Sequence, residues 1–234
     1  MKYNRVLLKL SGESLMGSQN YGIDPAMLEQ YTTDIKATVE AGIQVAIVIG
    51  GGNIFRGLSG AAKGMDRVQG DYMGMLATLI NSMALQAELE KQGLRTELLS
   101  GLAIEPICKE MSRRRAIEAM KEGRVVIIGG GSGNPFFTTD TASALRAVEI
   151  QADAILKGTR VDGVYTADPE KDPTAKKFTT LSFQEALGKK LKIMDLTAFA
   201  LCEENNLPIY VFDMNRQGNL LRVVSGEPIG TEIK

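Results

Sequence analysis

Glycine-rich turns that follow apolar runs are the segments of this chain best suited to chemistry. The sequence GGGSGNPFFTTD, residues 129–140, follows the apolar run 125–128 and precedes a helical pattern. A strand, a glycine turn and a helix start bring backbone N–H groups and a helix N-terminus close to an anion. Glycines also let the main chain approach a phosphate. A turn that needs glycine only for its conformation is the other interpretation of one such motif.

Repetition of this arrangement favours the phosphate interpretation. Polar or glycine-bearing segments lie at or directly after the ends of predicted strands at residues 9–12, 50–53, 129–140 and 157–159. Lys9 and Lys157 stand where strands are expected to end, and lysines are rarely buried unless they are paired. Both are therefore candidate ligands for an anion, although a solvated edge-strand lysine is the alternative for Lys9. Arg56 follows the second turn, and its planar guanidinium suits a phosphate.

Composition excludes several kinds of chemistry. The 234 residues include no histidine, which rules out a Ser-His-Asp triad, a Cys-His pair and a His-ligated zinc within this chain. Lys and Arg total 27 against 28 Asp and Glu, so the charge balance predicts no nucleic-acid partner. Cys108 and Cys202 match no metal spacing, and we expect reduced thiols in a cytoplasmic protein. No membrane span or signal peptide is expected.

Alternating apolar and amphipathic segments predict an α/β fold. Strands are expected over residues 5–10, 44–49, 94–99, 125–128, 154–156, 209–213 and 220–224. Helices are expected between Asp24 and Gly42, over 71–91 and 112–123, after 140, and over 183–187 and 195–205. This order implies a three-layer sandwich with a largely parallel central sheet, in a single domain spanning residues 1–234. Ligands of such sheets bind beyond the carboxyl ends of the strands, so all four turns should share one edge.

Two helical segments allow more than one interpretation. The 71–91 segment is apolar almost all round, which indicates a second buried surface, such as a subunit contact, or else a central helix of one domain. The run Arg113-Arg114-Arg115 could contact nucleic acid, but a solvated helix face is the preferred interpretation.

Phosphoryl transfer suits a site without histidine. No GxxxxGK[ST] motif is present, and the third glycine of a GxGxxG motif that begins at Gly129 would fall on Asn134. Phosphoryl transfer needs mainly positioning, positive charge and N–H donors. A phosphate acceptor is mostly ionised at neutral pH, so no strong general base is required. Several glycine turns and two strand-end lysines suit two phosphorylated ligands better than one.

Five motifs resemble those of the bacterial uridylate kinases, which have the amino-acid-kinase fold. They are KLSGE at 9–13, GGGNIFRG at 50–57, GNPFFTTD at 133–140, VDGVYTADP at 161–169 and KIMDL at 192–196. The resemblance extends over about residues 5–231. The glycine turns alone indicate only the wider family, with its acetylglutamate, carbamate and aspartate kinases. GNPFFTTD together with GDYMGMLAT at 70–78 narrows the resemblance to the uridylate kinases.

The resemblance implies transfer of the ATP γ-phosphoryl group to UMP in pyrimidine nucleotide biosynthesis, with Mg²⁺ held mainly by the phosphates and no protein metal ligand. The implied catalytic residues are Lys9, Asp140, Lys157 and Asp195, with Lys9 and Lys157 supplying charge and the carboxylates organising the lysines. Implied ATP contacts are Lys9, Leu10, Ser11, Gly12, Gly52, Arg56, Thr159, Tyr165 and Asp168. Implied UMP contacts are Gly51, Asp71, Ser132, Gly133, Asn134, Pro135, Phe136, Phe137, Thr138 and Thr139. Asp71 would bind the ribose, and Asn134 would lie near the uracil.

Departures from the family pattern bear on regulation. Ser132 stands where the family often has Thr, which keeps a hydroxyl. Residues 17–22, GSQNYG, match a segment tied to GTP activation in some members but differ from its EGFG-like sequence, which leaves GTP control of this allosteric family open. The resemblance also implies a homohexamer. Two alternatives remain: another kinase of the family with a carboxylate or carbamate acceptor, and a nucleotide-sensing module without turnover. The presence of Lys9, Arg56 and Asp140 disfavours the sensing module.

Overall fold

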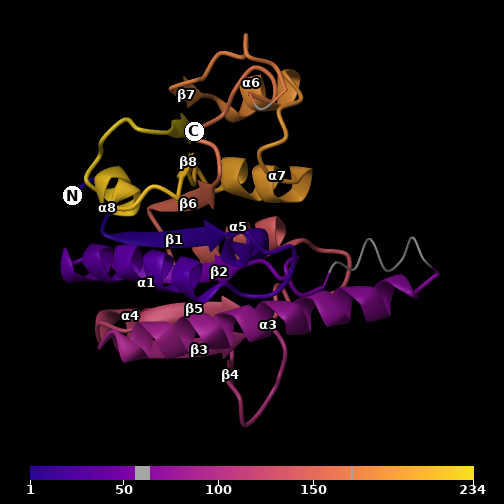
Figure 1. Ribbon diagram of the computed structural model, residues 1–234, viewed down its shortest axis with the longest axis vertical. Coiled ribbons are helices and arrows are strands. Elements are labelled where there is room, and N and C mark those ends of the chain that lie inside the picture. Colours follow the sequence, from indigo (N-terminus) through magenta and orange to yellow (C-terminus); the bar gives the residue numbers. More distant parts are fainter. Residues whose placement is uncertain (56–63, 170) are drawn as a thin grey trace.

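The computed structural model describes residues 1–55, 64–169 and 171–234, and it shows a central sheet between two layers of helices (Figure 1). The sheet has nine strands in the order β4-β3-β5-β2-β1-β6-β8-β9-β7, which runs from bottom to top in Figure 1. The strands are β1 Arg5–Leu10, β2 Gln44–Ile49, β3 Thr96–Ser100, β4 Lys109–Glu110, β5 Val125–Gly129, β6 Ala154–Thr159, β7 Thr180–Leu181, β8 Ile209–Asp213 and β9 Thr231–Ile233. Only the β8–β9 pair is antiparallel in this sheet of described residues, so the predicted α/β class with a largely parallel sheet is confirmed.

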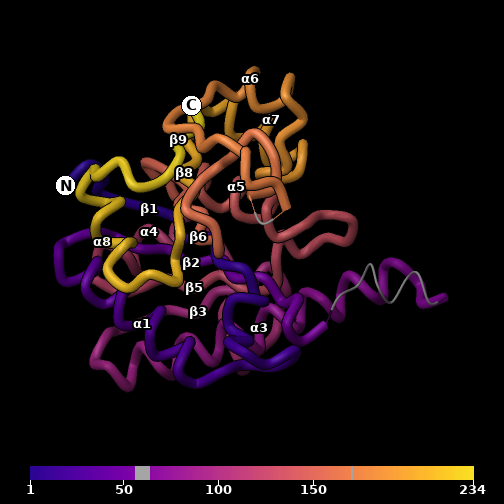
Figure 2. Tube along the Cα trace, turned by 45° about the horizontal axis from the view of Figure 1, so that its top comes forward, coloured from indigo at the N-terminus to yellow at the C-terminus, as the bar shows by residue number. Residues whose placement is uncertain are grey.

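Helices cover both faces because the strand residues alternate between two apolar clusters. On β1, Val6, Leu8 and Leu10 belong to one cluster, which α1, α3 and α8 cover. Leu7 belongs to the other, which α4, α5 and α7 cover. The helices are α1 Pro25–Glu40, α3 Arg67–Lys91, α4 Arg113–Lys121, α5 Thr139–Glu149, α6 Phe183–Gly188, α7 Leu196–Glu204 and α8 Asn219–Val224, with a 3-10 helix at Gly12–Met16. Figure 2 shows α6 and α7 at the end of the molecule opposite α3.

Capping residues set several helix starts. Asp24 caps α1 by accepting a hydrogen bond from the Ala26 backbone N–H, and Pro25 is the first residue of the helix. The sequence predicted both features. Helix α3 begins at Arg67 rather than at the predicted residue 71, because the Asp66 side chain caps it by accepting from the Gln69 backbone. Strands β1, β2 and β8 coincide with the predicted ranges.

One predicted strand is wrong. Residues 220–224 form most of α8, which starts after Gly218 in a left-handed conformation, at φ 84°. Leu220, Val223 and Val224 are buried at helical spacing. A short apolar run does not distinguish a strand from one face of a helix, which explains the error. The short strands β4, β7 and β9 were not predicted.

An apolar surface runs along the outside of α3. Five large side chains of this helix are at least one third exposed in the single chain: Tyr72, Met73, Leu76, Ile80 and Met83. Arg113, Arg114 and Arg115 are also exposed, on the first turn of α4, which agrees with the predicted solvated face. None of the helices within 1–55, 64–169 and 171–234 has the length and apolar character of a membrane span.

Candidate active site

Two lysines lie side by side at the carboxyl ends of the central strands. Lys9 of β1 and Lys157 of β6 are partners in the parallel register. Because side chains alternate along a strand, both point toward the face that α5 covers. The first turn of α5 presents Asp140 there: Lys9 Nζ lies 2.6 Å from Asp140 Oδ1, and Lys157 Nζ lies 3.1 Å from Oδ2. We call Lys9, Asp140 and Lys157 the lysine cluster.

Burial and charge act together in the lysine cluster. Burial alone would raise the pKa of Asp140, but the charges of Lys9 and Lys157 outweigh it and hold this pKa below its usual value. Burial, with the neighbouring charge of Lys9, lowers the pKa of Lys157, while Asp140 and Asp195 oppose that shift. Lys157 Nζ also donates to the Ile193 carbonyl. Two ammonium groups share one carboxylate, so the cluster keeps a positive charge that suits an anion.

Asp195 holds α5 rather than pairing directly with the two lysines. It caps α7, accepting a 2.8 Å hydrogen bond from the Ala198 backbone. Its carboxylate also accepts from the Thr138 hydroxyl and, at 2.9 Å for each oxygen, from the Thr141 hydroxyl. These bonds fix the N-terminus of α5, which carries Asp140. Asp195 therefore acts on the lysine cluster through the helix and through its charge.

A cavity of about 390 Å³ opens between α3 and the 131–139 loop, and we call it the α3 cavity. It is lined by Gly51, Arg67, Gly70, Asp71, Gly74, Met75, Thr78, Gly131, Ser132, Asn134, Phe137, Thr138 and Thr139. Seven of the ten residues implied for UMP are in this lining: Gly51, Asp71, Ser132, Asn134, Phe137, Thr138 and Thr139. The N-terminus of α5 and the backbone of Gly51 give the cavity hydrogen-bond donors suited to an anion.

Three residues implied for UMP, Gly133, Pro135 and Phe136, belong to the loop without lining the α3 cavity. Gly133 has φ 84°, and a Cβ there would lie 2.3 Å from the Gly101 carbonyl oxygen, so glycine is required for packing. The backbone N–H of Phe136 donates to Asp71 Oδ2 at 2.8 Å.

Arg67 was missed by the sequence analysis. Its Nε lies 2.9 Å from both carboxylate oxygens of Asp71, and it lines the α3 cavity. The i, i+4 spacing of Arg67 and Asp71 at a helix start was the signal that could have found it.

A second cavity, of about 540 Å³, lies beside the end of β6, and we call it the β6 cavity. Lys157 of the lysine cluster lines it, together with Thr159, Tyr165 and Asp168, three of the residues implied for ATP. Three lysines that the sequence analysis did not assign also line it: Lys189, Lys190 and Lys192. The cavity therefore combines apolar walls, such as Val211, with positive charge suited to a nucleotide.

The turns after β1 and β2 pack against each other. A Cβ on Gly12 would lie 2.5 Å from both the Gly50 carbonyl and the Asn53 side chain, so this approach requires glycine. The Leu10 side chain is fully buried in the core, which leaves only its backbone for a ligand. Ser11 precedes the 3-10 helix, Gly12 begins it, and Gly52 lies in the turn after β2. Arg56 lies outside the described residues.

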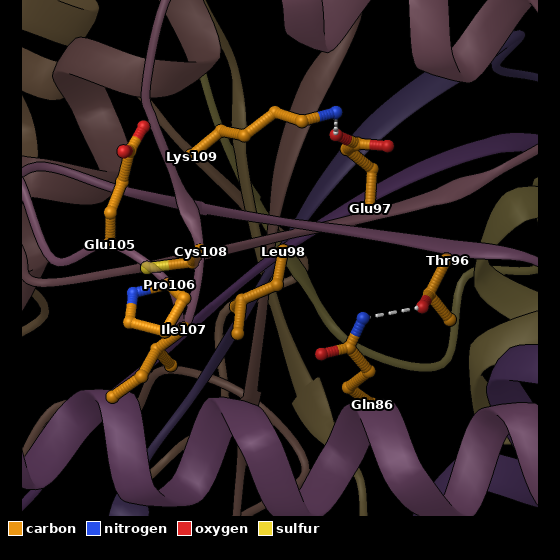
Figure 3. Close-up of a pocket in the computed structure, with 9 residues that line it drawn as sticks. All are labelled: Gln86, Thr96, Glu97, Leu98, Glu105, Pro106, Ile107, Cys108 and Lys109. Carbon is orange, nitrogen blue, oxygen red and sulfur yellow. Dashed lines mark hydrogen bonds and ion pairs between the residues drawn. The ribbon is translucent and has the colours of Figure 1, made fainter.

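A third cavity, of about 300 Å³, lies between α3 and the strands β3 and β4 (Figure 3). Hydrogen bonds join Gln86 to Thr96 and Lys109 to Glu97 across it. None of the residues implied for ATP or UMP lines it.

Residues 1–55, 64–169 and 171–234 contain no cluster of three or more acidic, histidine or cysteine side chains that could hold a metal ion. Asp140, on the first turn of α5, is engaged by two lysines. A metal ion that is held by phosphate oxygens fits this arrangement better than one in a protein cage.

Comparison with known proteins identifies the class to which this fold and site belong. The model of the amino acid kinase family matches residues 4–213, and the chain belongs to that family. The uridylate kinase of Parabacteroides distasonis is 61% identical to this chain over 230 residues, which cover 98% of this chain and 98% of the relative. The uridylate kinase of Porphyromonas gingivalis is 62% identical over 231 residues, which cover 99% of this chain and 97% of the relative. A UMP kinase structure from Bacillus anthracis has a TM-score of 0.96 at 38% identity, covering 100% of this chain and 97% of its own. The resemblance to uridylate kinases is confirmed.

Proposed function

We propose that the protein is a UMP kinase, which transfers the γ-phosphoryl group of ATP to UMP and releases UDP and ADP, a step of pyrimidine nucleotide biosynthesis in the cytoplasm. The observation that carries the proposal is the lysine cluster between two nucleotide-sized cavities. Lys157 itself lines the β6 cavity, and Thr139, next to Asp140, lines the α3 cavity. Two phosphorylated ligands in these cavities would meet at the positive charge.

Charge stabilisation is the main chemical task that we assign to the lysine cluster. Negative charge spreads over the oxygens of the transferred phosphoryl group, and fixed cations in a partly buried site stabilise it. Lys9 and Lys157 supply the cations, Asp140 holds them in place, and Asp195 fixes the helix that carries Asp140. The acceptor phosphate is its own nucleophile, so the absence of histidine presents no obstacle. Mg²⁺ bound to the nucleotide phosphates supplies further positive charge.

UMP is assigned to the α3 cavity. Asp71 accepts hydrogen bonds from the ribose, Asn134 lies near the uracil, and the α5 N-terminus at Thr138 and Thr139 faces the phosphate. The remaining acceptor contacts are assigned to Gly51 and to the loop residues Ser132, Gly133, Pro135, Phe136 and Phe137.

ATP is assigned to the β6 cavity. Thr159, Tyr165 and Asp168 hold the adenosine end. The phosphates extend from there to Lys9 and to the turns that carry Leu10, Ser11, Gly12, Gly52 and Arg56. Lys189, Lys190 and Lys192, which also line the β6 cavity, would lie near the ATP.

Assembly as a homohexamer is the second part of the proposal. The apolar surface of α3, with Tyr72, Met73, Leu76, Ile80 and Met83, supports a subunit contact because isolated monomers rarely expose so contiguous an apolar face. Light scattering after size-exclusion chromatography measures the assembly: Leu76→Lys should lower the molar mass, whereas an unchanged mass would exclude this surface as a contact.

The proposed function is tested by finding which acceptor the protein phosphorylates. ADP release from ATP and Mg²⁺ is measured with UMP, CMP, AMP, acetylglutamate or carbamate, and we expect turnover with UMP. Turnover only with a carboxylate or carbamate would keep the family and overturn the acceptor assignments. Folded protein that turns over none of these acceptors would support the nucleotide-sensing alternative. The same assay with GTP or UTP added tests the allosteric behaviour that the family resemblance implies.

A further inference from the structure

Arg67 and Asp71, one helical turn apart at the start of α3, form a fixed pair. Arg67 Nε lies 2.9 Å from each carboxylate oxygen of Asp71. The Asp71 side chain is only 12% exposed, while that of Arg67 is 40% exposed. An exposed ion pair contributes little by itself, but here the carboxylate is largely shielded and lines the α3 cavity. The contact therefore restricts the direction in which Asp71 presents its oxygens.

Phe136, in the loop before α5, contacts both members of this pair. It has φ 72°, a left-handed conformation that is unfavourable for a residue with a Cβ. Two contacts hold it there. Its backbone N–H donates to Asp71 Oδ2 at 2.8 Å, and the guanidinium carbon of Arg67 lies 5.6 Å from the centroid of its ring. The residue is 65% exposed, so burial does not account for the conformation.

The remaining hydrogen-bonding capacity of Asp71 fits a pair of hydroxyls. An ionised carboxylate offers about four lone-pair directions. Arg67 and the Phe136 backbone use part of this capacity, and the rest is available to a ligand in the cavity. A second role for Arg67, as the main cation for the acceptor phosphate, is disfavoured because Asp71 offsets its charge at 2.9 Å.

We propose that Arg67 is a positioning residue for the acceptor, and that it sets the preference for a ribonucleotide over a 2′-deoxynucleotide. By holding the Asp71 carboxylate in one orientation and keeping the Phe136 segment against α3, it aligns the oxygens that accept from the ribose hydroxyls. The inference rests on the proposed UMP kinase activity and adds a residue to its acceptor site.

Steady-state kinetics with UMP and dUMP test the role of Arg67. Arg67→Met keeps an unbranched, largely apolar side chain and removes its donors, and Arg113→Met on the exposed start of α4 is the matched control. We expect the KM for UMP to rise about tenfold in Arg67→Met, the loss typical of one charge-assisted hydrogen bond. The kcat and the KM for ATP should change little. The KM or inhibition constant for dUMP should rise less than the KM for UMP, because dUMP keeps only the 3′-hydroxyl of the pair. Arg67→Lys should recover part of the UMP affinity.

A double-mutant cycle separates positioning from a general structural effect. If Arg67 acts through Asp71, Arg67→Met should add almost nothing to the KM effect of Asp71→Asn. The inference would be overturned if the two substitutions multiplied each other's effect on the KM for UMP. An unchanged KM for UMP in Arg67→Met, or rises of equal size for UMP and dUMP, would also overturn it. Failure of the wild-type protein to phosphorylate UMP would instead overturn the proposed function, so the two failures are distinguishable.

Discussion

The side-chain amides of Asn53 and Asn81 bond to each other in both directions. Asn53 Nδ2 donates to Asn81 Oδ1 at 3.0 Å, and Asn81 Nδ2 donates to Asn53 Oδ1 at 2.7 Å. Asn53 also donates to the Gly22 carbonyl, and Asn81 donates to the Gly50 carbonyl. Both residues are almost completely buried. The pair therefore ties the turn after β2 to α3 and to the end of the 17–22 loop.

Asn81→Leu should destabilise the protein strongly. The substitution removes the donors to Gly50 and Asn53 and leaves buried polar groups unpaired, which we expect to cost about 3 kcal/mol. Chemical denaturation measures the free energy of unfolding. Ser82→Ala is the control, because the buried Ser82 hydroxyl bonds only to the preceding turn at Thr78 among its described contacts. A loss no larger than that of Ser82→Ala would contradict a special role for the amide pair.

Lys9→Ala should lower kcat by about a factor of 100 or more, since a fixed charge that acts in the transition state contributes at least this much. Binding of UMP, measured by calorimetry, should weaken only modestly, because UMP is assigned mainly to the α3 cavity. Lys121→Ala, at the exposed end of α4, is the control for loss of a positive charge. Normal turnover in Lys9→Ala would show that the lysine cluster is not the site of transfer.

Asp71→Ala should raise the KM for UMP by about tenfold or more, because the ribose loses a charged acceptor. The KM for ATP should stay near its wild-type value, since the β6 cavity does not include Asp71. Initial rates with each substrate varied in turn provide both constants. Glu118→Ala, an exposed change on α4, is the control. Equal effects on both constants would argue against a ribose contact.

The stability contributed by Asp140 should depend on pH. Burial alone would raise its pKa, but Lys9 and Lys157 hold that pKa below the usual value in the folded state. Asp195 supports the charge of Lys157 by opposing the lowering of the lysine's pKa. A lowered carboxyl pKa stabilises the folded state above about pH 4, and this contribution is lost as pH falls through the folded-state pKa. Asp140→Asn should therefore lose about 3 kcal/mol at pH 7 and less near pH 3. A pH-independent difference between the two unfolding curves would contradict this assignment.

The two cysteines should differ in reactivity. Cys202 is fully buried, and burial raises its pKa to about 12. The thiolate is the reactive form, so a thiol reagent at pH 8 should modify Cys202 only when the protein unfolds. Cys108 is 7% exposed and lines the cavity of Figure 3, so it should react first. Peptide mass spectrometry measures the labelling rate of each cysteine. Equal labelling rates of Cys108 and Cys202 in the native protein would contradict the prediction.

Local signals in the sequence determined much of the sheet and the start of α1. The apolar runs 5–10, 44–49 and 209–213 have the same bounds as β1, β2 and β8. Asp24 and Pro25 correctly marked the start of α1. These features depend on periodicity, caps and turns, which act over a few residues and can therefore be found without tertiary contacts.

Other features depend on contacts between distant segments. Residues 220–224 form α8 because their apolar side chains pack on one side of the helix, where a short run alone allowed a strand. Asp195 bonds to the threonines of α5, 54 and 57 residues away.

The sequence alone determined that Lys9 and Lys157 lie near the carboxyl ends of strands and close to polar or glycine-bearing turns, because each strand and turn is specified locally. Only the tertiary structure decided that the register sets Lys9 beside Lys157, with Asp140 between them. It also decided that Phe136 meets Asp71, which lies 65 residues earlier. The physical reason is that pairing energies depend on distance and burial, and both of these are fixed by the packing of the whole chain.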